Sequence, residues 1–470
     1  MVVCDLSTTI DINDAGPLSR GQIVFMVAAL VTSVIAFQLN ASMLAPAIGA
    51  INGAMGPNAY VAMSNFFFLA GAVACVVLVR WSDYVGRKRV LISIMVLMCI
   101  GTVLCIVSTS LPVVVLGRIL QGGCVISFPL SYLIQREHLS PMAFGACVGV
   151  VSSINGGVAG VDALLGGVMV DHLGYRSIFV LILAIGVAAI GFAWKAVPAD
   201  PPRGTTAGRM DWWGAALLAS TVGGVNMFLI AGGTSGWLST STVAWIFVGV
   251  LSLVGLIVVD TRIRSPLIAI EHLRSRQEWP VVTTTILALA SFFVVLNFIV
   301  PHLAVNADVG FGANGTTTAL LFLTPAALVG VVSAPVFGRL AIRIGFVTTA
   351  RLGILATLLV TVAVAVFAMN DNILFGLMAA FGLTYNGALL TSLSAMGVAQ
   401  SCDEEPGALP GITNSCFGIG AAVGFAWAGA VVGSGTEASY LLALWLCVAI
   451  GAVALLSSLI LQPKPFERRT

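Results

Sequence analysis

The sequence predicts an all-α polytopic membrane protein with about 14 transmembrane helices. Hydrophobic residues make up 59% of the 470-residue chain and charged residues only 9%, so polar groups are too few to cover a soluble globule. The mean hydropathy is +1.06. The apolar runs also reach the ~20 residues that a helix needs to cross a bilayer.

The apolar runs fall into three groups. The clearest linker, at 198–204, is too rich in proline and charge to cross a membrane, and a second, basic connection covers 260–279. These breaks predict a 6+2+6 arrangement. We expect an N-terminal six-helix bundle in 1–197, a linker with two extra transmembrane helices in 198–277, and a C-terminal six-helix bundle in 278–470. The expected spans lie near 22–43, 58–79, 90–108, 112–135, 142–171, 176–194, 211–232, 243–261, 278–301, 316–337, 347–368, 372–398, 407–432 and 438–461.

Basic residues give an independent indication of topology. If the spans alternate from a cytoplasmic N-terminus, all but two of the 21 Lys and Arg residues lie on the cytoplasmic side. The exceptions are Arg118, inside a span, and Arg176, on the opposite side. Because basic residues favour cytoplasmic loops, this distribution predicts a multi-pass protein of the plasma membrane with both termini in the cytoplasm.

A charged turn at 82–89 separates the second and third expected spans. Asp83 can cap and neutralise the following helix, Gly86 permits a sharp reversal, and Arg87 and Lys88 favour a cytoplasmic position. The turn resembles the loop between the second and third spans of major facilitator transporters, Gly-x-Leu-Ala-Asp-x-x-Gly-Arg-Lys, without the first Gly and the Leu. The resemblance implies a major facilitator fold, in which Asp83, Gly86, Arg87 and Lys88 gate the conformational change.

A weaker copy of this turn follows the second span of the C-terminal group. Residues 338–345 place Ile342 where Asp83 would stand and Gly345 where Gly86 would stand. Repeats related by an axis along the membrane normal generate the two halves of major facilitator proteins. The second copy therefore supports the same fold.

Arg118 is the strongest polar signal inside a span. A guanidinium cannot be deprotonated and costs at least ~2.5–3.5 kcal/mol near the bilayer centre, so Arg118 needs a partner or water. With Gln121 and Gly122 it matches the fourth-span signature Arg-x-x-Gln-Gly of the same family. That resemblance implies a role for Arg118 in proton coupling and for Gln121 and Gly122 in conformational gating. The alternative is that Arg118 ties helices together through backbone carbonyls.

Asp162 is the one carboxylate deep in an expected span, the fifth. Its depth matches that of Arg118, which predicts a switchable pair in which only Asp162 can change its charge. The alternative is a fixed structural salt bridge. Asp162 and Ala163 also stand where exporters of this family usually carry Gly-Pro, and Phe37 stands where the roughly fourteen-span drug:proton antiporters usually have an Asp. If protons drive this protein, we expect Asp162 to carry them.

Uncharged polar residues in the spans are candidates for a substrate cavity. We expect Gln38, Asn65, Asn155 and Asn386 to line it first, although such residues also form hydrogen bonds between helices. No phosphate-binding glycine loop, metal-ligand spacing of His and Cys, disulfide framework or basic cluster with interleaved aromatics is present in the sequence. The sequence thus predicts no enzymatic activity, no cofactor, no metal and no nucleic-acid partner.

The expected function is secondary active transport by alternating access. Taken with the resemblance to the fourteen-span drug:proton antiporters, the sequence favours proton-coupled export of a small lipophilic, neutral or anionic compound by a monomer in the lipid bilayer. Two alternatives stay open, namely a proton-coupled uptake symporter and a non-transporting receptor or lipid-handling protein on the same fold. Proton-gradient-driven flux separates the first two by its sign and is absent in the third.

Overall fold

The computed structural model describes residues 19–139, 141–200, 210–263, 279–399 and 408–462, and within these ranges all regular structure is helical. Thirteen helical segments are long and apolar enough to cross a membrane. Helix α7 (Pro141–Leu173) adds a further helix of 33 residues. The all-α, multi-pass class is confirmed, whereas the count of about 14 spans and the 6+2+6 arrangement stay predictions.

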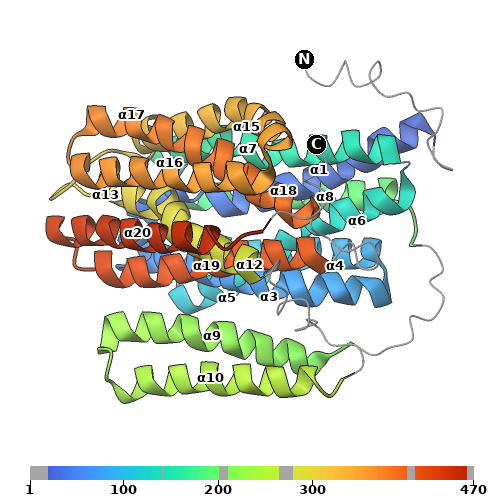
Figure 1. Cartoon of the computed structure of the whole chain (residues 1–470), viewed down its shortest axis with the longest axis horizontal. Coiled ribbons are helices and arrows are strands. Elements are labelled where there is room, and N and C mark those ends of the chain that lie inside the picture. Colours follow the sequence, from blue (N-terminus) through green and yellow to red (C-terminus); the bar gives the residue numbers. More distant parts are fainter. Residues whose placement is uncertain (1–18, 140, 201–209, 264–278, 400–407, 463–470) are drawn as a thin grey trace.

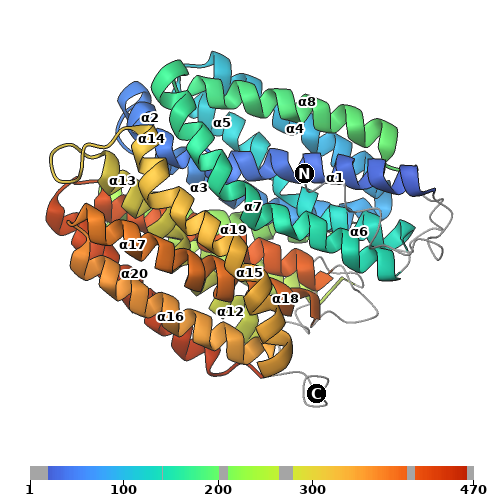
Figure 2. The same cartoon turned by 90° about the horizontal axis from the view of Figure 1, so that it is seen from above.

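The first group of helices, α1–α8, packs together on one side of the molecule (Figure 2). Helix α1 begins in a capping box in which Ser19 and Gln22 satisfy each other's backbone N–H groups. The apolar segment continues beyond the end of α1. A 3-10 turn that contains Pro46 connects α1 to the short helix α2. Apart from α7, the elements are α1 (Arg20–Ser42), η2 (Ala45–Ala47), α2 (Ile48–Met55), α3 (Ala59–Val85), α4 (Arg87–Val107), α5 (Leu111–Gly122), η3 (Gly123–Ile126), α6 (Ser127–His138) and α8 (Arg176–Ala196).

The last group, α12–α20, forms the other side of the molecule, and four π-helical stretches interrupt its helices. Such stretches are frequent at functional sites. The elements are α12 (Trp279–Ala288), η4 (Leu289–Phe293), η5 (Val295–Ile299), α13 (Val300–Val305), α14 (Gly315–Thr318), η6 (Ala319–Leu323), α15 (Thr324–Ile344), α16 (Phe346–Phe367), α17 (Asp371–Phe381), η7 (Gly382–Leu390), α18 (Thr391–Ala399), α19 (Ala408–Val432) and α20 (Glu437–Ser458).

The two middle helices, α9 (Trp212–Ser235) and α10 (Thr240–Asp260), form a hairpin at the edge of the molecule (Figure 1). Helix α9 packs against α19 and α3. Gly224 and Gly249 bring α9 and α10 so close that a Cβ on Gly224 would lie 2.6 Å from the backbone nitrogen of Gly249. Small residues of this kind allow close packing of membrane helices.

The two ends of the molecule can be distinguished by their turns. At the Gly86 end, α3 and α4 join at Gly86 (φ 112°) and α15 and α16 join at Gly345 (φ 93°). Both turns place a glycine at a positive φ angle, which other residues rarely adopt. This shared geometry agrees with the repeat seen in the sequence. The opposite end, called the Asp171 end, carries Asp171 and the first turn of α14.

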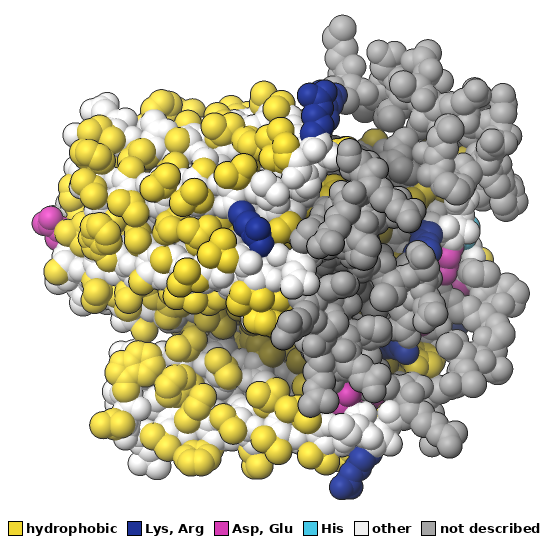
Figure 3. All heavy atoms as spheres, in the orientation of Figure 1, with side chains coloured by type: hydrophobic (Ala, Val, Ile, Leu, Met, Phe, Trp, Pro, Cys, Tyr) yellow, Lys and Arg dark blue, Asp and Glu magenta, His cyan; other side chains and the backbone are white. Residues whose placement is uncertain are grey.

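The outer surface is apolar over the length of the helices (Figure 3). Large side chains such as Trp213, Leu251 and Val332 are about three-quarters exposed, at 76%, 74% and 75%. Contiguous exposed apolar surface of this extent suits lipid contact rather than water. Several of the visible charged side chains lie toward one end in this view, which leaves a wide apolar area on this face of the molecule.

Candidate functional site

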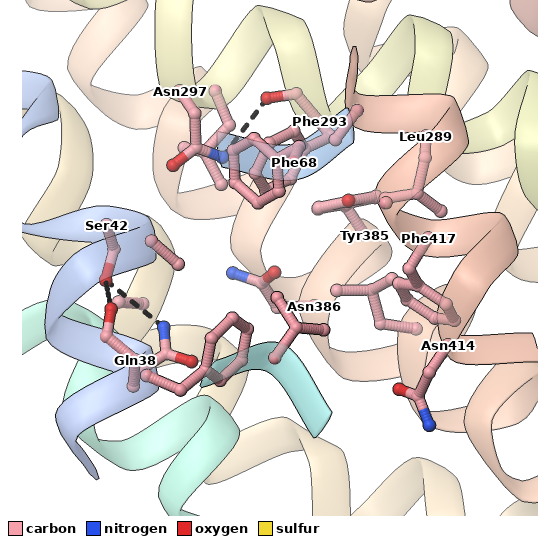
Figure 4. A pocket seen from close by; sticks show the side chains of 18 of the residues that line it. Gln38, Ser42, Phe68, Leu289, Phe293, Asn297, Tyr385, Asn386, Asn414 and Phe417 are labelled. Carbon is pink, nitrogen blue, oxygen red and sulfur yellow. Dashed lines mark hydrogen bonds between the residues drawn. The ribbon is translucent and has the colours of Figure 1, made fainter. Parts of the chain in front are cut away.

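A cavity of about 1170 Å³, including its open mouth, lies between the two groups of helices (Figure 4). No charged side chain is among the described residues that line it. One wall comes from α1, α3, η3, α6 and α7, and the other includes all four π-helical stretches. The lining residues are Phe37, Gln38, Ala41, Ser42, Phe68, Val125, Phe128, Ala163, Leu289, Phe293, Leu296, Asn297, Leu323, Ala327, Tyr385, Asn386, Leu390, Ser394, Asn414, Phe417, Gly418 and Ala421.

Amides and one phenol provide hydrogen-bonding groups in this cavity. The amide nitrogen of Asn297 donates to the carbonyl of Phe293 at 3.1 Å, and that of Asn386 donates to the carbonyl of Ala326 at 3.3 Å, so their side-chain carbonyls stay available. The Tyr385 side chain is 1% exposed, and its hydroxyl has no hydrogen-bond partner among the described residues. Buried hydroxyls without a partner are rare in folded proteins, which makes Tyr385 a candidate hydrogen-bonding group for a bound molecule.

Aromatic rings form the other part of the lining. Phe68 meets Phe293 edge-to-face, with ring centroids 5.3 Å apart, and Phe37 meets Phe128 in the same way at 6.0 Å. The rings come from both groups of helices, so a ligand between them would contact both halves. Faces and edges of this kind bind planar rings.

The cavity is closed at the Asp171 end. Tyr60, Phe298 and Phe425 pack together, and the Tyr60 hydroxyl donates to the carbonyl of Asn297 at 2.9 Å. Toward the Gly86 end, in contrast, the lining includes the exposed Ser394 and the partly exposed Asn414. The described lining is therefore more exposed toward the Gly86 end than at the Asp171 end.

Asp171 secures the closed end. Its carboxylate accepts bonds from the backbone nitrogens of Gly315 (3.0 Å) and Thr316 (2.7 Å) and from the Thr316 hydroxyl (2.6 Å). One turn earlier on α7, Gly167 lies against Gly315 so closely that a Cβ there would be 2.5 Å from the Gly315 carbonyl oxygen. This contact joins the two groups of helices where α7 meets α14.

Asp162 lies beside the cavity, 2% exposed, between Ser42 and the α7 backbone. Its Oδ2 is 2.5 Å from the Ser42 hydroxyl, and its Oδ1 has no partner among the described residues. Ser42 also contacts Gln38, whose amide nitrogen donates to the Ser42 hydroxyl at 3.2 Å. Asp162 is thus connected to the cavity through two lining residues.

Arg118 is 1% exposed and fully engaged by neutral groups. Its guanidinium donates to the side-chain oxygens of Asn40 (3.1 Å) and Gln121 (2.7 Å) and to the carbonyls of Asn40 (3.1 Å) and Met63 (3.3 Å). It also stacks over Phe67, 4.2 Å from the ring centroid. Cation–π contact and several acceptors together offset part of the cost of burial.

Arg118 and Asp162 do not pair in this structure. Arg118 binds Asn40 and Asp162 binds Ser42. These α1 residues are two positions apart, about 200° around the helix, so α1 stands between the two charges. The alternative in which Arg118 joins helices through backbone carbonyls describes this conformation, and an exchange of partners in another conformation stays a prediction.

Comparison with known proteins gives the family. The model of the Major Facilitator Superfamily matches residues 30–425. The chain belongs to the Major Facilitator Superfamily. The uridine/deoxyuridine transporter of Lactococcus lactis subsp. cremoris is 34% identical over 86% of each chain. The quinolone resistance protein NorB of Staphylococcus aureus is 23% identical over 89% of each, and the multidrug resistance protein Stp of Mycobacterium tuberculosis is 25% identical over 76% of this chain and 66% of its own.

Solved structures show the same fold at low sequence identity. The human organic anion transporter MFSD10 matches 94% of this chain and 99% of its own with a TM-score of 0.59 and 14% identity. The POT family transporter PepTSo matches 94% of this chain and 97% of its own with a TM-score of 0.62 and 13% identity. The match to the family model confirms the major facilitator resemblance that was inferred from the charged turn and the fourth-span signature.

The major facilitator turn at Gly86 is held differently from the expectation. Asp83 does not cap α4 but pairs with Arg87 at 3.4 Å within its own turn. The cap comes from Asp200, whose Oδ1 accepts from the backbone nitrogen of Lys88 at 2.9 Å. Any Cβ on Gly86 would collide with the Asp200 carboxylate. The segment after α8 occupies the position that sequence reasoning gave to Asp83.

The basic residues of this turn join it to neighbouring helices. Arg87 pairs with Glu137 at 3.1 Å and donates to the Leu133 carbonyl at 2.7 Å, which ties α4 to α6. The Lys88 ammonium donates to the carbonyls of Trp194 (2.8 Å) and Val197 (2.6 Å) near the end of α8. These links lie within the first group of helices, and a gating role stays a prediction.

The other predicted site residues have different positions. Gln38 and Asn386 line the cavity, whereas Asn65 donates to the Ala422 carbonyl at 2.7 Å in the interface of α3 and α19. The side chain of Asn155 lies outside the described residues. Gln121 donates to Thr102 at 2.8 Å, and Gly122 packs against α3, where a Cβ would lie 2.6 Å from the Phe67 carbonyl.

Sequence reasoning missed Ser42, because a serine near the end of an apolar run carries no distinctive signal.

Proposed function

We propose that this major facilitator protein transports a neutral, ring-containing polar solute of the nucleoside class through the central cavity, by alternating access and with proton coupling at Asp162. The cavity lining carries the proposal, since it combines amides, a free phenol and aromatic rings without a charged side chain among the described residues. An ionic solute would lose its hydration there without an opposite charge to replace it.

The amide and aromatic groups suit a nucleobase. The imide edge of a base such as uracil has an N–H donor between two carbonyl acceptors. An amide side chain can pair with such an edge, because it has both a carbonyl acceptor and an N–H donor. Asn297 and Asn386 each have a side-chain carbonyl that their own donated bond leaves available. A planar base also stacks on aromatic side chains, which is worth about 1–3 kcal/mol per base in nucleic-acid complexes. The uridine/deoxyuridine transporter, 34% identical over 86% of each chain, supports the same solute class.

Proton coupling at Asp162 is the second part of the proposal. It is supported by the burial of the carboxyl group and by its connection to the cavity through Ser42 and Gln38. A buried carboxyl group is neutralised most simply by a proton when no cation pairs with it. Export, expected from the sequence, and uptake both use such a site, and they differ in whether the solute moves opposite to the proton or together with it.

Export of lipophilic drugs is the second candidate. More than half of the lining residues are apolar or aromatic, and NorB and Stp are named as resistance proteins. An apolar compound would use the rings of the lining and leave the Tyr385 hydroxyl unpartnered. That buried hydroxyl favours the polar solute, because an unsatisfied group costs about 1–3 kcal/mol.

Binding to the purified protein tests the solute class. Unlabelled uridine is expected to displace radiolabelled uridine, whereas uridine monophosphate is not, because its phosphate brings charge into an uncharged cavity. Asn386→Ala is expected to weaken binding, and the control Asn372→Ala, an exposed residue at the start of α17, to leave it unchanged. Displacement by a quinolone but by no nucleoside would favour the second candidate, and binding of the monophosphate as tightly as uridine would contradict the proposal.

A further inference from the structure

The Ser42 hydroxyl has more hydrogen-bonded neighbours than it has hydrogens. It lies 2.9 Å from the Gln38 carbonyl oxygen, 2.5 Å from Asp162 Oδ2 and 3.2 Å from the Gln38 amide nitrogen. A hydroxyl has one hydrogen to donate and two lone pairs with which to accept. The amide nitrogen can only donate to Ser42, so the single Ser42 hydrogen must serve either the Gln38 carbonyl or Asp162.

Two proton arrangements satisfy this geometry. When Asp162 is ionised, Ser42 donates to the carboxylate. When Asp162 is protonated, the carboxylic acid donates to Ser42, and Ser42 donates instead to the Gln38 carbonyl. The incoming proton therefore stays on Asp162, and the only further change is a rotation of the Ser42 hydroxyl. Asp162 keeps a hydrogen-bond partner in both states.

The Gln38 amide acts unequally on the two states. In the ionised state its N–H donates to Ser42 while Ser42 donates to the carboxylate, and successive donors in such a chain strengthen one another. In the protonated state Ser42 already accepts from Asp162, so the Gln38 N–H adds no support to a negative charge. Loss of the Gln38 donation thus costs the ionised state more than the protonated state.

We infer that Ser42 is a positioning residue through which solute binding at Gln38 and proton binding at Asp162 favour each other, as in a symporter. The inference rests on the proposed transport of a neutral solute. Gln38 lines the cavity, so a solute that binds the Gln38 amide and turns this side chain toward itself removes the N–H that Ser42 accepts. The protonated state is then favoured, and by reciprocity the protonated protein binds the solute more tightly.

No cation or second acid competes for Asp162 among the described residues. Helix α7 packs against α1, η2, α6, α8, α14, η6 and α15, and no ion pair to Asp162 is formed from them. Arg118 faces the other side of α1. The charged or titratable residues of these packed elements are Arg20, Tyr132, Arg136, Glu137, His138, Arg176, Lys195, Arg339 and Arg343, and all but Tyr132 lie toward the helix ends.

The first test is uridine binding by purified protein as a function of pH, with proton exchange followed by an indicator dye in weak buffer. The wild type is expected to take up a proton on binding, and affinity to fall about tenfold per pH unit on the alkaline side. Ser42→Ala is expected to lose most of this dependence while still binding. Ser33→Ala is the matched control, because Ser33 makes the same bond to the carbonyl four residues earlier on α1 without touching Asp162.

A second measurement needs no solute. Infrared spectra, assigned by the loss of the band in Asp162→Asn, report the protonated share of the Asp162 carboxyl group. At a fixed pH, Gln38→Ala and Ser42→Ala are expected to raise that share, and Ser33→Ala to leave it unchanged. An unchanged share in Gln38→Ala, or proton release on uridine binding, would overturn the inference. Absence of uridine binding with the expected infrared result would instead remove only the proposed solute class.

Discussion

Tyr385 offers the sharpest test of the cavity at the scale of a single residue. Its hydroxyl has no hydrogen-bond partner among the described residues, so Tyr385→Phe is expected to leave stability nearly unchanged and to weaken uridine binding by about 0.5–1.5 kcal/mol. Tyr440→Phe is the matched control, because that hydroxyl bonds His302 at 2.6 Å and Asn306 at 3.2 Å outside the cavity. The control should lower the thermal midpoint and spare affinity. Unaltered affinity in Tyr385→Phe would remove the phenol from the binding site.

Arg118 is expected to be a structural requirement in this conformation. Arg118→Ala leaves buried acceptors on Asn40, Gln121 and Met63 unpaired, each costing about 1–3 kcal/mol. Arg118→Lys should restore little, because an ammonium lacks the planar fork that reaches several acceptors and the ring of Phe67. Thermal unfolding in detergent measures this loss. A midpoint for Arg118→Ala equal to that of the wild type would contradict the role.

The sequence predicted which residues carry charge inside the helices but not what they touch. Arg118 and Asp162 stand out because ionised groups are rare in membrane runs. Equal depth suggested that they pair, yet depth does not determine helix face, and α1 separates them. The cap of α4 by Asp200 was unpredictable for a similar reason, since it joins positions 112 residues apart.

At the scale of helices, the contact between α7 and α14 holds the two groups of helices together at the Asp171 end of the cavity. Gly167→Ala is expected to hold this end open, because the added Cβ would lie 2.5 Å from the Gly315 carbonyl. Distances between spin labels on the two groups of helices should lengthen there. Gly191→Ala is the control, because nothing lies within 4 Å of its Cβ position on α8. Unchanged distances in Gly167→Ala would show that the helices close by another contact.

The π-helical stretches mark the limit of helix prediction from sequence. Hydrophobic runs located each of these helices, and the repeat at 338–345 falls at a turn between two of them. The runs gave no sign of η4, η5, η6 or η7, because a local change of helical period depends on packing rather than on composition. These stretches nevertheless turn Asn297, Tyr385 and Asn386 into the cavity.

At the scale of the whole molecule, composition and charge placement were sufficient for the class. Few charges and long apolar runs exclude a soluble protein, and two short motifs indicated the superfamily that the family comparison then confirmed. The sequence favoured export of a small lipophilic, neutral or anionic compound, and the comparisons leave solute and direction open. The proposed solute class rests on which uncharged groups meet between two halves that are distant in the chain, and the proposed direction rests on the surroundings of Asp162.

Uridine flux in sealed vesicles with an imposed proton gradient tests the central claim most directly. We expect an inward proton gradient to drive uridine accumulation. Asp162→Asn, which mimics the permanently protonated state, should abolish accumulation while preserving exchange of internal for external uridine. Two results would contradict symport through Asp162. One is extrusion of uridine driven by the inward proton gradient, and the other is full accumulation by Asp162→Asn.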